Sequence, residues 1–177
     1  MRRDSELHNK AENGQTAVAH GAVQRVHADY TPDNGPEKLR QLEESGHVPK
    51  GIAAGRRWSV VNVWRSIDTE RPVQALPLAV LDASTVSADD TFTYALVMNE
   101  ATPPLVGFNN GVSFSKEHSW YYYSAMQHEE ALLFYTYDGS FQTSKPRFVF
   151  HSAVTDPSSP PDAPPRKSIE CRCLAIF

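Results

Sequence analysis

Short apolar segments follow one another along this chain, and each is closed within a few residues by proline, glycine or aspartate. Segments rich in β-branched and aromatic residues are typical of strands, and such breaks are typical of turns. The predicted strands cover residues 21–30, 58–67, 76–83, 91–98, 118–124, 129–137, 148–154 and 166–177. One helix is predicted at residues 36–44, with Pro36 in its first turn and Gly46 just past its end. A loop is predicted at residues 108–114. Many short strands and little helix predict a mainly β fold, a sandwich or a barrel.

The N-terminal 22 residues differ from the rest, because they are polar, carry scattered charges and lack hydrophobic periodicity. We expect residues 1–22 to be disordered or loosely attached, and residues 23–177 to form one domain. The net charge of −4 and the absence of a basic or amphipathic stretch argue against nucleic-acid and membrane-surface partners. No apolar run is long enough to span a membrane and the polar N-terminus is unlike a signal peptide, so a cytoplasmic protein is expected.

An imidazole and a carboxylate are expected side by side in the first predicted strand. His27 and Asp29 are two residues apart, and residues two apart in a strand point to the same face. One distant histidine on a neighbouring strand would complete two histidines and a carboxylate, the facial triad typical of non-haem Fe(II) oxygenases. The pattern His-x-Asp is common by chance, so it is weak evidence alone.

A later histidine and the strand that follows it strengthen this interpretation. His151 lies in predicted strand 148–154, and Arg166 and Ser168 would share one face of the last strand. Arginine binds a carboxylate with two parallel hydrogen bonds, and the serine adds a hydroxyl, as needed to hold the far carboxylate of a 2-oxo acid. A metal held by strands from both ends of the sequence suits a double-sheet jelly roll of the cupin type.

Three polar side chains are further candidates for the pocket. Asn62 and Arg65 lie in the apolar strand 58–67, and buried polar groups need partners. Each could serve the pocket or tie loops together. Tyr122 belongs to an aromatic stripe, which is core more often than it is a substrate site. Cys171 and Cys173 would face away from Arg166, and we expect them to be buried strand residues rather than a zinc site.

Seven stretches together resemble one family: VQRVHADYT, NVWRSI, LPLAVLDAS, HSWYYYSAM, EALLFYTYD, FHSAVTDP and APPRKSIECR. It is the AsaB/CmcJ-like group of non-haem iron, 2-oxoglutarate-dependent oxygenases, fungal and bacterial hydroxylases and desaturases related to gibberellin desaturase. The resemblance covers nearly the whole chain. It implies iron ligands at His27, Asp29 and His151, and a 2-oxoglutarate anchor at Arg166 and Ser168. It also implies hydroxylation or desaturation of a small molecule in secondary metabolism, with O₂ as the oxidant.

This chain departs from the family mainly at its front. Ser66 stands where proline is usual, and Lys167 replaces an acidic residue. Family members are longer, with a substantial stretch before the His-x-Asp strand, so we expect this chain to correspond to an N-terminally truncated, incomplete jelly roll. Strand 58–64 is apolar on both faces, and without covering strands it would favour self-association.

Three functions remain open from the sequence. The first is an oxygenase using Fe(II) and 2-oxoglutarate. The second is a catalytically impaired relic of the same family that acts as a binding protein, and iron-dependent turnover of 2-oxoglutarate would separate these two. The third, a structural zinc or cupin-like binding protein, leaves Arg166 and Ser168 without a purpose.

Overall fold

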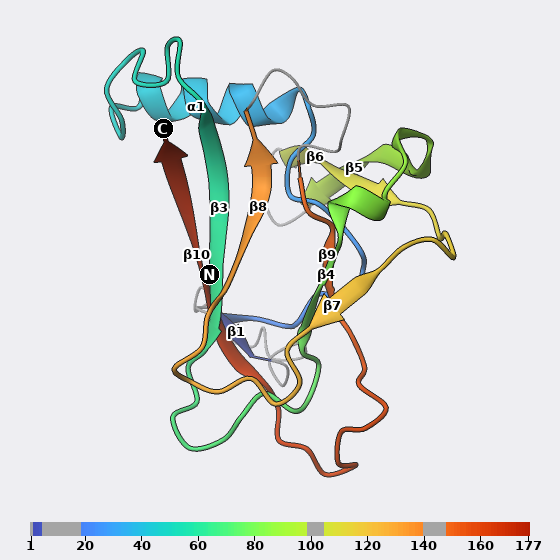
Figure 1. The fold of residues 1–177 in the computed structure, drawn as a ribbon. Coiled ribbons are helices and arrows are strands. Elements are labelled where there is room, and N and C mark those ends of the chain that lie inside the picture. The colour runs from blue at the N-terminus through green and yellow to red at the C-terminus, as the bar shows by residue number, and fades with distance from the viewer. Residues whose placement is uncertain (1, 5–18, 99–104, 140–147) are drawn as a thin grey trace.

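A computed structural model describes residues 2–4, 19–98, 105–139 and 148–177 (Figure 1). Its strands form three groups. The large sheet has the order β2-β1-β10-β3-β8, with bounds Ala19–His20, Arg2–Asp4, Lys167–Ile176, Trp58–Ser66 and Leu132–Asp138. The small sheet has the order β7-β4-β9, with bounds Trp120–Tyr122, Leu78–Leu81 and His151–Ala153. The hairpin consists of β5 and β6, with bounds Thr91–Met98 and Leu105–Val112.

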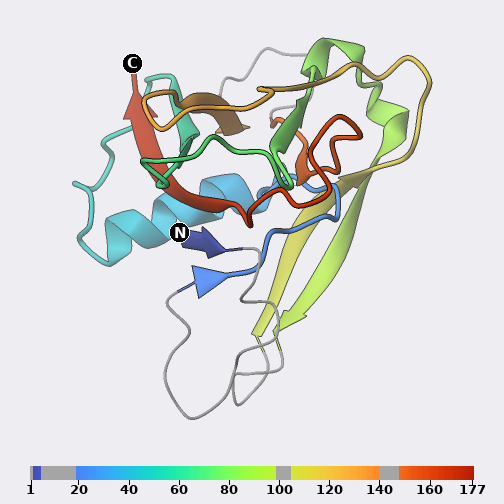
Figure 2. The same cartoon turned by 90° about the horizontal axis from the view of Figure 1, so that it is seen from below.

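Helix α1 (Asn34–Glu44) lies across one end of the large sheet, and the hairpin β5–β6 extends away beside the small sheet (Figures 1 and 2). The two single-turn 3-10 helices, Ala83–Thr85 and Ala88–Asp90, connect β4 to the hairpin. Among the described residues no helix is long and apolar enough to cross a membrane. The predicted mainly β architecture with one short α-helix is therefore confirmed.

Strand β3 organises the large sheet, because it pairs antiparallel with β10 along its whole length and with β8 on its other side. Alternate residues of β3 point inward, as the period of two in a strand requires. Trp64 packs there with Phe134 of β8 and with Leu78 and Met126, which closes the space between the two sheets. Under helix α1, a second cluster of buried side chains comprises Tyr30, Trp58, Val60 and Tyr137.

Two predicted elements differ from the structure. Residues 21–30 do not form a continuous strand: they run between β9 and β6 and form only two isolated bridges, His27 with His151 and Ala28 with Asn110. Because β9 and β6 belong to different sheets, the segment forms no continuous ladder of hydrogen bonds with either strand. Residues 108–114 were expected to be a loop, but β6 runs through Gly111 to Val112. A Cβ at Gly111 would lie 2.5 Å from the ring of Phe92 on β5, so this glycine permits close packing rather than a turn.

The N-terminal segment is described only in part. Arg2–Asp4 form β1, which pairs antiparallel with the start of β10 and parallel with β2. Residues 1 and 5–18 lie outside the described residues, so the expected loose attachment of this segment stays a prediction.

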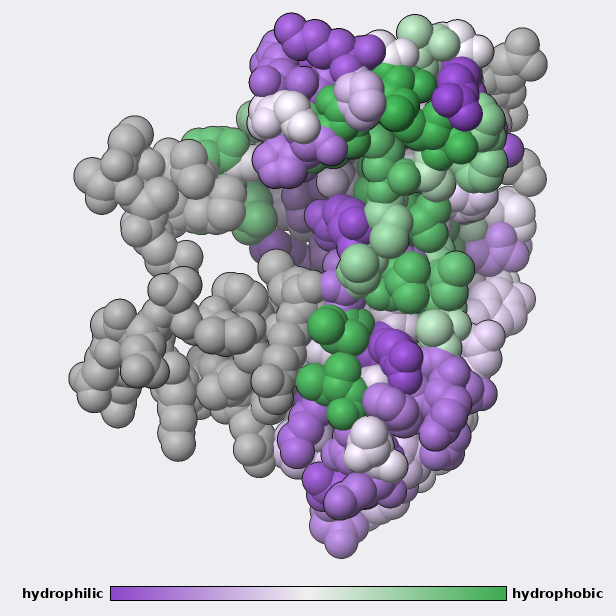
Figure 3. Space-filling model, turned by 90° about the vertical axis from the view of Figure 1, so that its left-hand side faces the viewer, coloured by the Kyte–Doolittle hydropathy of each residue, from purple (hydrophilic) through white to green (hydrophobic). Residues whose placement is uncertain are grey.

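The outer face of the large sheet carries an apolar stripe, seen in green in Figure 3. Its members are the outward-pointing residues of β3, β8 and β10: Val61, Val63, Leu133, Tyr135, Ile169, Cys171 and Cys173. Leu133 is 62% exposed, and both cysteines are exposed. The expectation that the cysteines are buried was therefore wrong. The inner face of β10 packs in the sandwich, whereas no described residue covers its outer face.

Candidate metal centre

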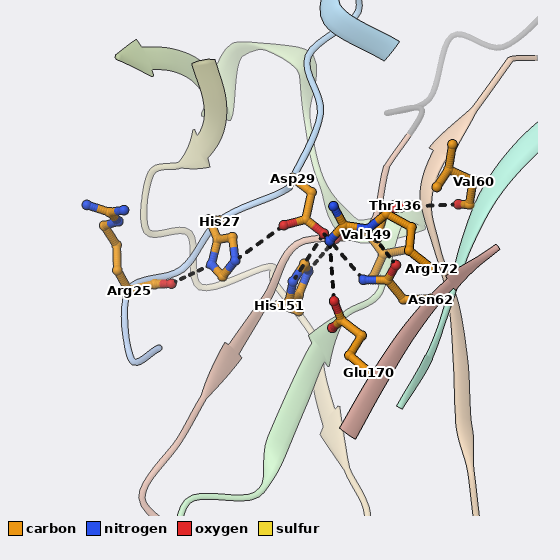
Figure 4. Close-up of polar contacts among 10 residues, drawn as sticks. All are labelled: Arg25, His27, Asp29, Val60, Asn62, Thr136, Val149, His151, Glu170 and Arg172. Carbon is orange, nitrogen blue, oxygen red and sulfur yellow. Dashed lines mark hydrogen bonds and ion pairs between the residues drawn. The ribbon is translucent and has the colours of Figure 1, made fainter. Parts of the chain in front are cut away.

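His27, Asp29 and His151 are brought together between the sheets, although His27 and His151 come from opposite ends of the sequence (Figure 4). The backbones of the two histidines exchange hydrogen bonds of 3.1 and 2.9 Å, and their ring centroids lie 4.4 Å apart. Nε2 of His27 lies 3.7 Å from Oδ1 of Asp29, and Nε2 of His151 lies 4.0 Å from Oδ2. One nitrogen or oxygen from each residue lies within 4.8 Å of the others, which is the spacing of atoms able to share one cation.

Both imidazoles are oriented by a hydrogen bond from Nδ1 to the backbone carbonyl two residues earlier. Nδ1 of His27 donates to the carbonyl of Arg25 at 2.8 Å, and Nδ1 of His151 donates to the carbonyl of Val149 at 3.1 Å. A carbonyl only accepts, so the proton lies on Nδ1 and the lone pair on Nε2. Metal-binding histidines are commonly fixed in this way, with the second ring nitrogen donating to a carbonyl or carboxylate.

The electrostatics favour the protonation states that metal binding requires. Burial lowers the pKa of His27, and the neighbouring His151 lowers it further. Burial alone would raise the pKa of Asp29, but His151, Arg172 and His27 together outweigh it and hold that pKa below its usual value. At neutral pH this leaves a neutral imidazole beside an ionised carboxylate, as coordination needs.

The three side chains line a cavity of about 560 Å³ that also receives Arg166. Arg166 is only 4% exposed; its guanidinium lies 5.2 Å from the ring centroid of Trp64, and Nη1 donates to the carbonyl of Leu76. Leu76 itself has a φ of 51°, a left-handed backbone that is rare for leucine and that recurs at functional sites. Arg166 is thus held in place at the wall of the cavity.

Ser168 lies two residues beyond Arg166, near the start of β10, and it is completely buried. Its hydroxyl has no hydrogen-bond partner among the described residues. A buried polar atom without a partner is costly, and such atoms often await a ligand. Of the two predicted anchor residues, both of which are buried, Arg166 lines the cavity and Ser168 is not among its lining residues.

The remaining predicted pocket residues have different positions. Asn62 is fully buried and donates to Asp29 at 3.3 Å. Arg65 does not line the cavity and donates to the carbonyl of His128. Tyr122 is exposed on β7 and hydrogen-bonds Asp156, also away from the cavity lining.

Sequence reasoning missed two residues at this site, Glu170 and Arg172, which both line the cavity. They follow Ser168 at steps of two along β10, so the alternation of the strand places these three residues on one face, and Arg166 lies just before the strand. That alternation was the signal that could have found them.

Comparisons with known proteins agree with this geometry. Residues 1–176 match the model of a family described as an oxidoreductase/YMDC permease-like domain. The chain is 31% identical over 171 residues to the Fe(II)/2-oxoglutarate-dependent dioxygenase nvfI of Aspergillus novofumigatus, covering 96% of this chain and 58% of the relative. It is 33% identical over 130 residues to the hydroxylase/desaturase asaB of Aspergillus flavus, covering 68% of this chain and 56% of the relative.

The solved structure of the iron and alpha-ketoglutarate-dependent endoperoxidase NvfI matches 99% of this chain with a TM-score of 0.73 and 30% identity. This chain covers 59% of that structure. The match confirms the predicted double-sheet jelly roll. The chain therefore spans rather more than half the length of the proteins that it resembles.

Proposed function

The chain belongs to the AsaB-like family of non-haem Fe(II)/2-oxoglutarate-dependent oxygenases, and on this basis we propose that it hydroxylates or desaturates a small molecule with O₂ as the oxidant. The observation that carries the proposal is the shared cavity, in which the His27–Asp29–His151 cluster and Arg166 line the same space. The relatives, fungal proteins such as the dioxygenase nvfI and the hydroxylase/desaturase asaB, support a place in fungal secondary metabolism.

In this proposal His27, Asp29 and His151 hold Fe(II). Their ligand atoms lie within 4.8 Å of one another and all three residues line the cavity, so a metal held there would be open to small molecules in that space. When bound, Fe(II) and 2-oxoglutarate supply the activation of O₂, with oxidative decarboxylation of the 2-oxo acid to succinate. The contribution of the protein is orientation and a sheltered environment.

Arg166 and Ser168 anchor 2-oxoglutarate. The guanidinium would pair with the carboxylate that points away from the metal, and the Ser168 hydroxyl would donate to the same group. Trp64 and Leu78 form apolar walls next to Arg166 and keep water away from this ion pair. Burial of the pair in low dielectric makes the charge-assisted hydrogen bonds strong.

Arg25, Leu96 and Asn109 also line the cavity and would be available to contact the organic substrate. A cavity of about 560 Å³ falls within the range of small-molecule sites, which is roughly 300–1,000 Å³. The proposed cytoplasmic location is compatible with Cys171 and Cys173, which are exposed and not joined in a disulfide in the structure.

Turnover without the organic substrate tests the reaction class. We expect the purified chain to release succinate from 2-oxoglutarate only when Fe(II) and O₂ are both present, and a chelator to stop the release. The measurement is succinate by chromatography, with Asp29→Ala as the inactive control and Arg57→Leu as a control far from the cavity. Tight binding of metal and 2-oxoglutarate with no succinate would instead favour the impaired relic that acts as a binding protein.

We also propose that the protein self-associates through the apolar stripe. Leu133 lies on β8, which has no further strand beyond it in the described part of the large sheet. Such an edge and an exposed apolar face both favour pairing between chains.

The apparent mass is therefore expected to rise with protein concentration, as measured by size-exclusion chromatography with light scattering. Leu133→Lys should move the midpoint of association to at least about tenfold higher concentration, since burying a leucine contributes roughly 1.5–3 kcal/mol. Gln41→Lys, on the exposed side of helix α1, is the matched control. A wild-type protein that stays monomeric at every concentration would contradict this proposal.

A further inference from the structure

Two other side chains, those of Arg172 and Asn62, both bond to the same oxygen of the Asp29 carboxylate. Nη2 of Arg172 lies 2.6 Å from Oδ2 of Asp29, and Nδ2 of Asn62 donates to the same oxygen at 3.3 Å. Nε of Arg172 donates to Oδ1 of Asn62 at 3.1 Å, so the three side chains form a closed ring of hydrogen bonds (Figure 4). We call Arg172 and Asn62 the carboxylate clamp.

The clamp is built into the large sheet. Arg172 of β10 and Asn62 of β3 are direct partners in the antiparallel register, which fixes their side chains next to each other. The guanidinium lies 5.5 Å from the ring centroid of Tyr30 and also donates to Glu170 at 3.3 Å. Asn62 has no exposed surface, so its amide has little freedom to turn away.

The other oxygen of Asp29, Oδ1, is the one nearer to His27, whereas Nε2 of His151 lies 4.0 Å from Oδ2. Oδ1 lies 3.7 Å from Nε2 of His27, and neither Arg172 nor Asn62 bonds to it. A carboxylate that binds a metal through both oxygens occupies one of the positions that a facial triad leaves open. Engaging Oδ2 in hydrogen bonds to Arg172 and Asn62 would keep that position available.

We propose that Arg172 is a positioning residue for Asp29: with Asn62 it holds Oδ2, so that Asp29 offers the metal a single oxygen, Oδ1. This inference rests on the proposed function, because it assumes that Asp29 is a metal ligand. The fork of the guanidinium is essential to it, since Nη2 binds Asp29 while Nε binds Asn62. A lysine keeps the charge but cannot make both bonds.

The sign of the effect on metal affinity separates this role from a simpler one. If Arg172 only balanced the charge of Asp29 in the metal-free protein, its removal would free the carboxylate and relieve repulsion of the cation, so binding would tighten. If Arg172 positions Asp29, its removal lets the carboxylate rotate, and binding weakens. Replacing residues that orient metal ligands typically costs about 10–100-fold in affinity.

The experiment uses the full chain and Co(II), whose visible absorption depends on the number and geometry of its ligands. Calorimetry and the Co(II) spectrum are measured for wild type, Arg172→Leu and Arg172→Lys, with Arg57→Leu as a matched control. Arg57 also pairs with an aspartate, Asp138, at 3.0 Å, but lies outside the cavity lining. Both Arg172 variants should bind Co(II) about 10–100-fold more weakly and with an altered spectrum, and the control should match wild type.

Circular dichroism checks that each variant is folded. If Arg172→Leu does not fold, the comparison of wild type with Arg172→Lys decides the outcome. Wild-type protein that fails to bind Co(II) would overturn the proposed metal site and this inference with it. Wild type that binds Co(II), with Arg172 variants that bind equally or more tightly, would overturn only the positioning role. A lysine variant with wild-type affinity and spectrum would likewise overturn it, because charge alone would then suffice.

Discussion

Replacing His151 by alanine is expected to abolish tight metal binding, raising the dissociation constant for Mn(II) by more than about 100-fold. Loss of a residue that merely orients a ligand costs about 10–100-fold, and loss of the ligand itself should cost more. His151 is 4% exposed, its Nε2 lies 4.0 Å from Asp29, and among the described residues the candidate cluster holds only His27 and Asp29 besides it. Calorimetry measures the dissociation constant with Mn(II), which is used because it is less readily oxidised than Fe(II).

His118→Gln is a fitting control, because the His118 side chain is equally buried and hydrogen-bonded to Asp90 but lies outside the metal cluster. It should leave Mn(II) affinity unchanged. Equal affinity in wild type and His151→Ala would remove His151 from the ligand set.

The second large effect is expected at the cosubstrate anchor. Arg166→Leu should weaken the binding of 2-oxoglutarate by about 2–5 kcal/mol, because the buried carboxylate of the ligand would be left without its charged partner. This corresponds to roughly 30-fold to several thousandfold in dissociation constant. Metal affinity should change little, since Arg166 bonds to the Leu76 carbonyl and stacks near Trp64 rather than on the cluster.

Calorimetry of 2-oxoglutarate binding to the Mn(II)-loaded protein tests this expectation. Arg166→Lys should restore little of the affinity, because it lacks the planar fork that pairs with both carboxylate oxygens. Succinate, which keeps the far carboxylate but lacks the 2-oxo group, should lose affinity in the same variants. Unchanged 2-oxoglutarate affinity in Arg166→Leu would place the anchor elsewhere.

The sequence was a good guide wherever a strand alternates between two environments. The period of two in the last strand separated Ser168 from the two cysteines, and the structure has Ser168 buried and both cysteines exposed. The apolar pattern of 58–67 likewise identified β3 and both its faces. Strand alternation is a local property, so it can be read without knowing the rest of the fold.

Properties that depend on distant partners could not be predicted in this way. Residues 21–30 lack a ladder because their neighbours on the two sides belong to different sheets. Asn109 and Asn110 look like a turn in sequence, yet full pairing with β5 makes them part of a strand. Arg172 pairs with Asp29, which is far away in the sequence, and no local sequence pattern predicts such a pair.

The bridge between His27 and His151 also has a consequence for the order of events during synthesis. Contacts between residues far apart in sequence form late, because a long loop must close before they repay its entropy. His27 and Asp29 are synthesised well before His151, so a nascent chain carries two of the proposed ligands without the third. In the proposed site, Fe(II) would find its full ligand set only once these distant segments have met. The metal would then stabilise only that closed state.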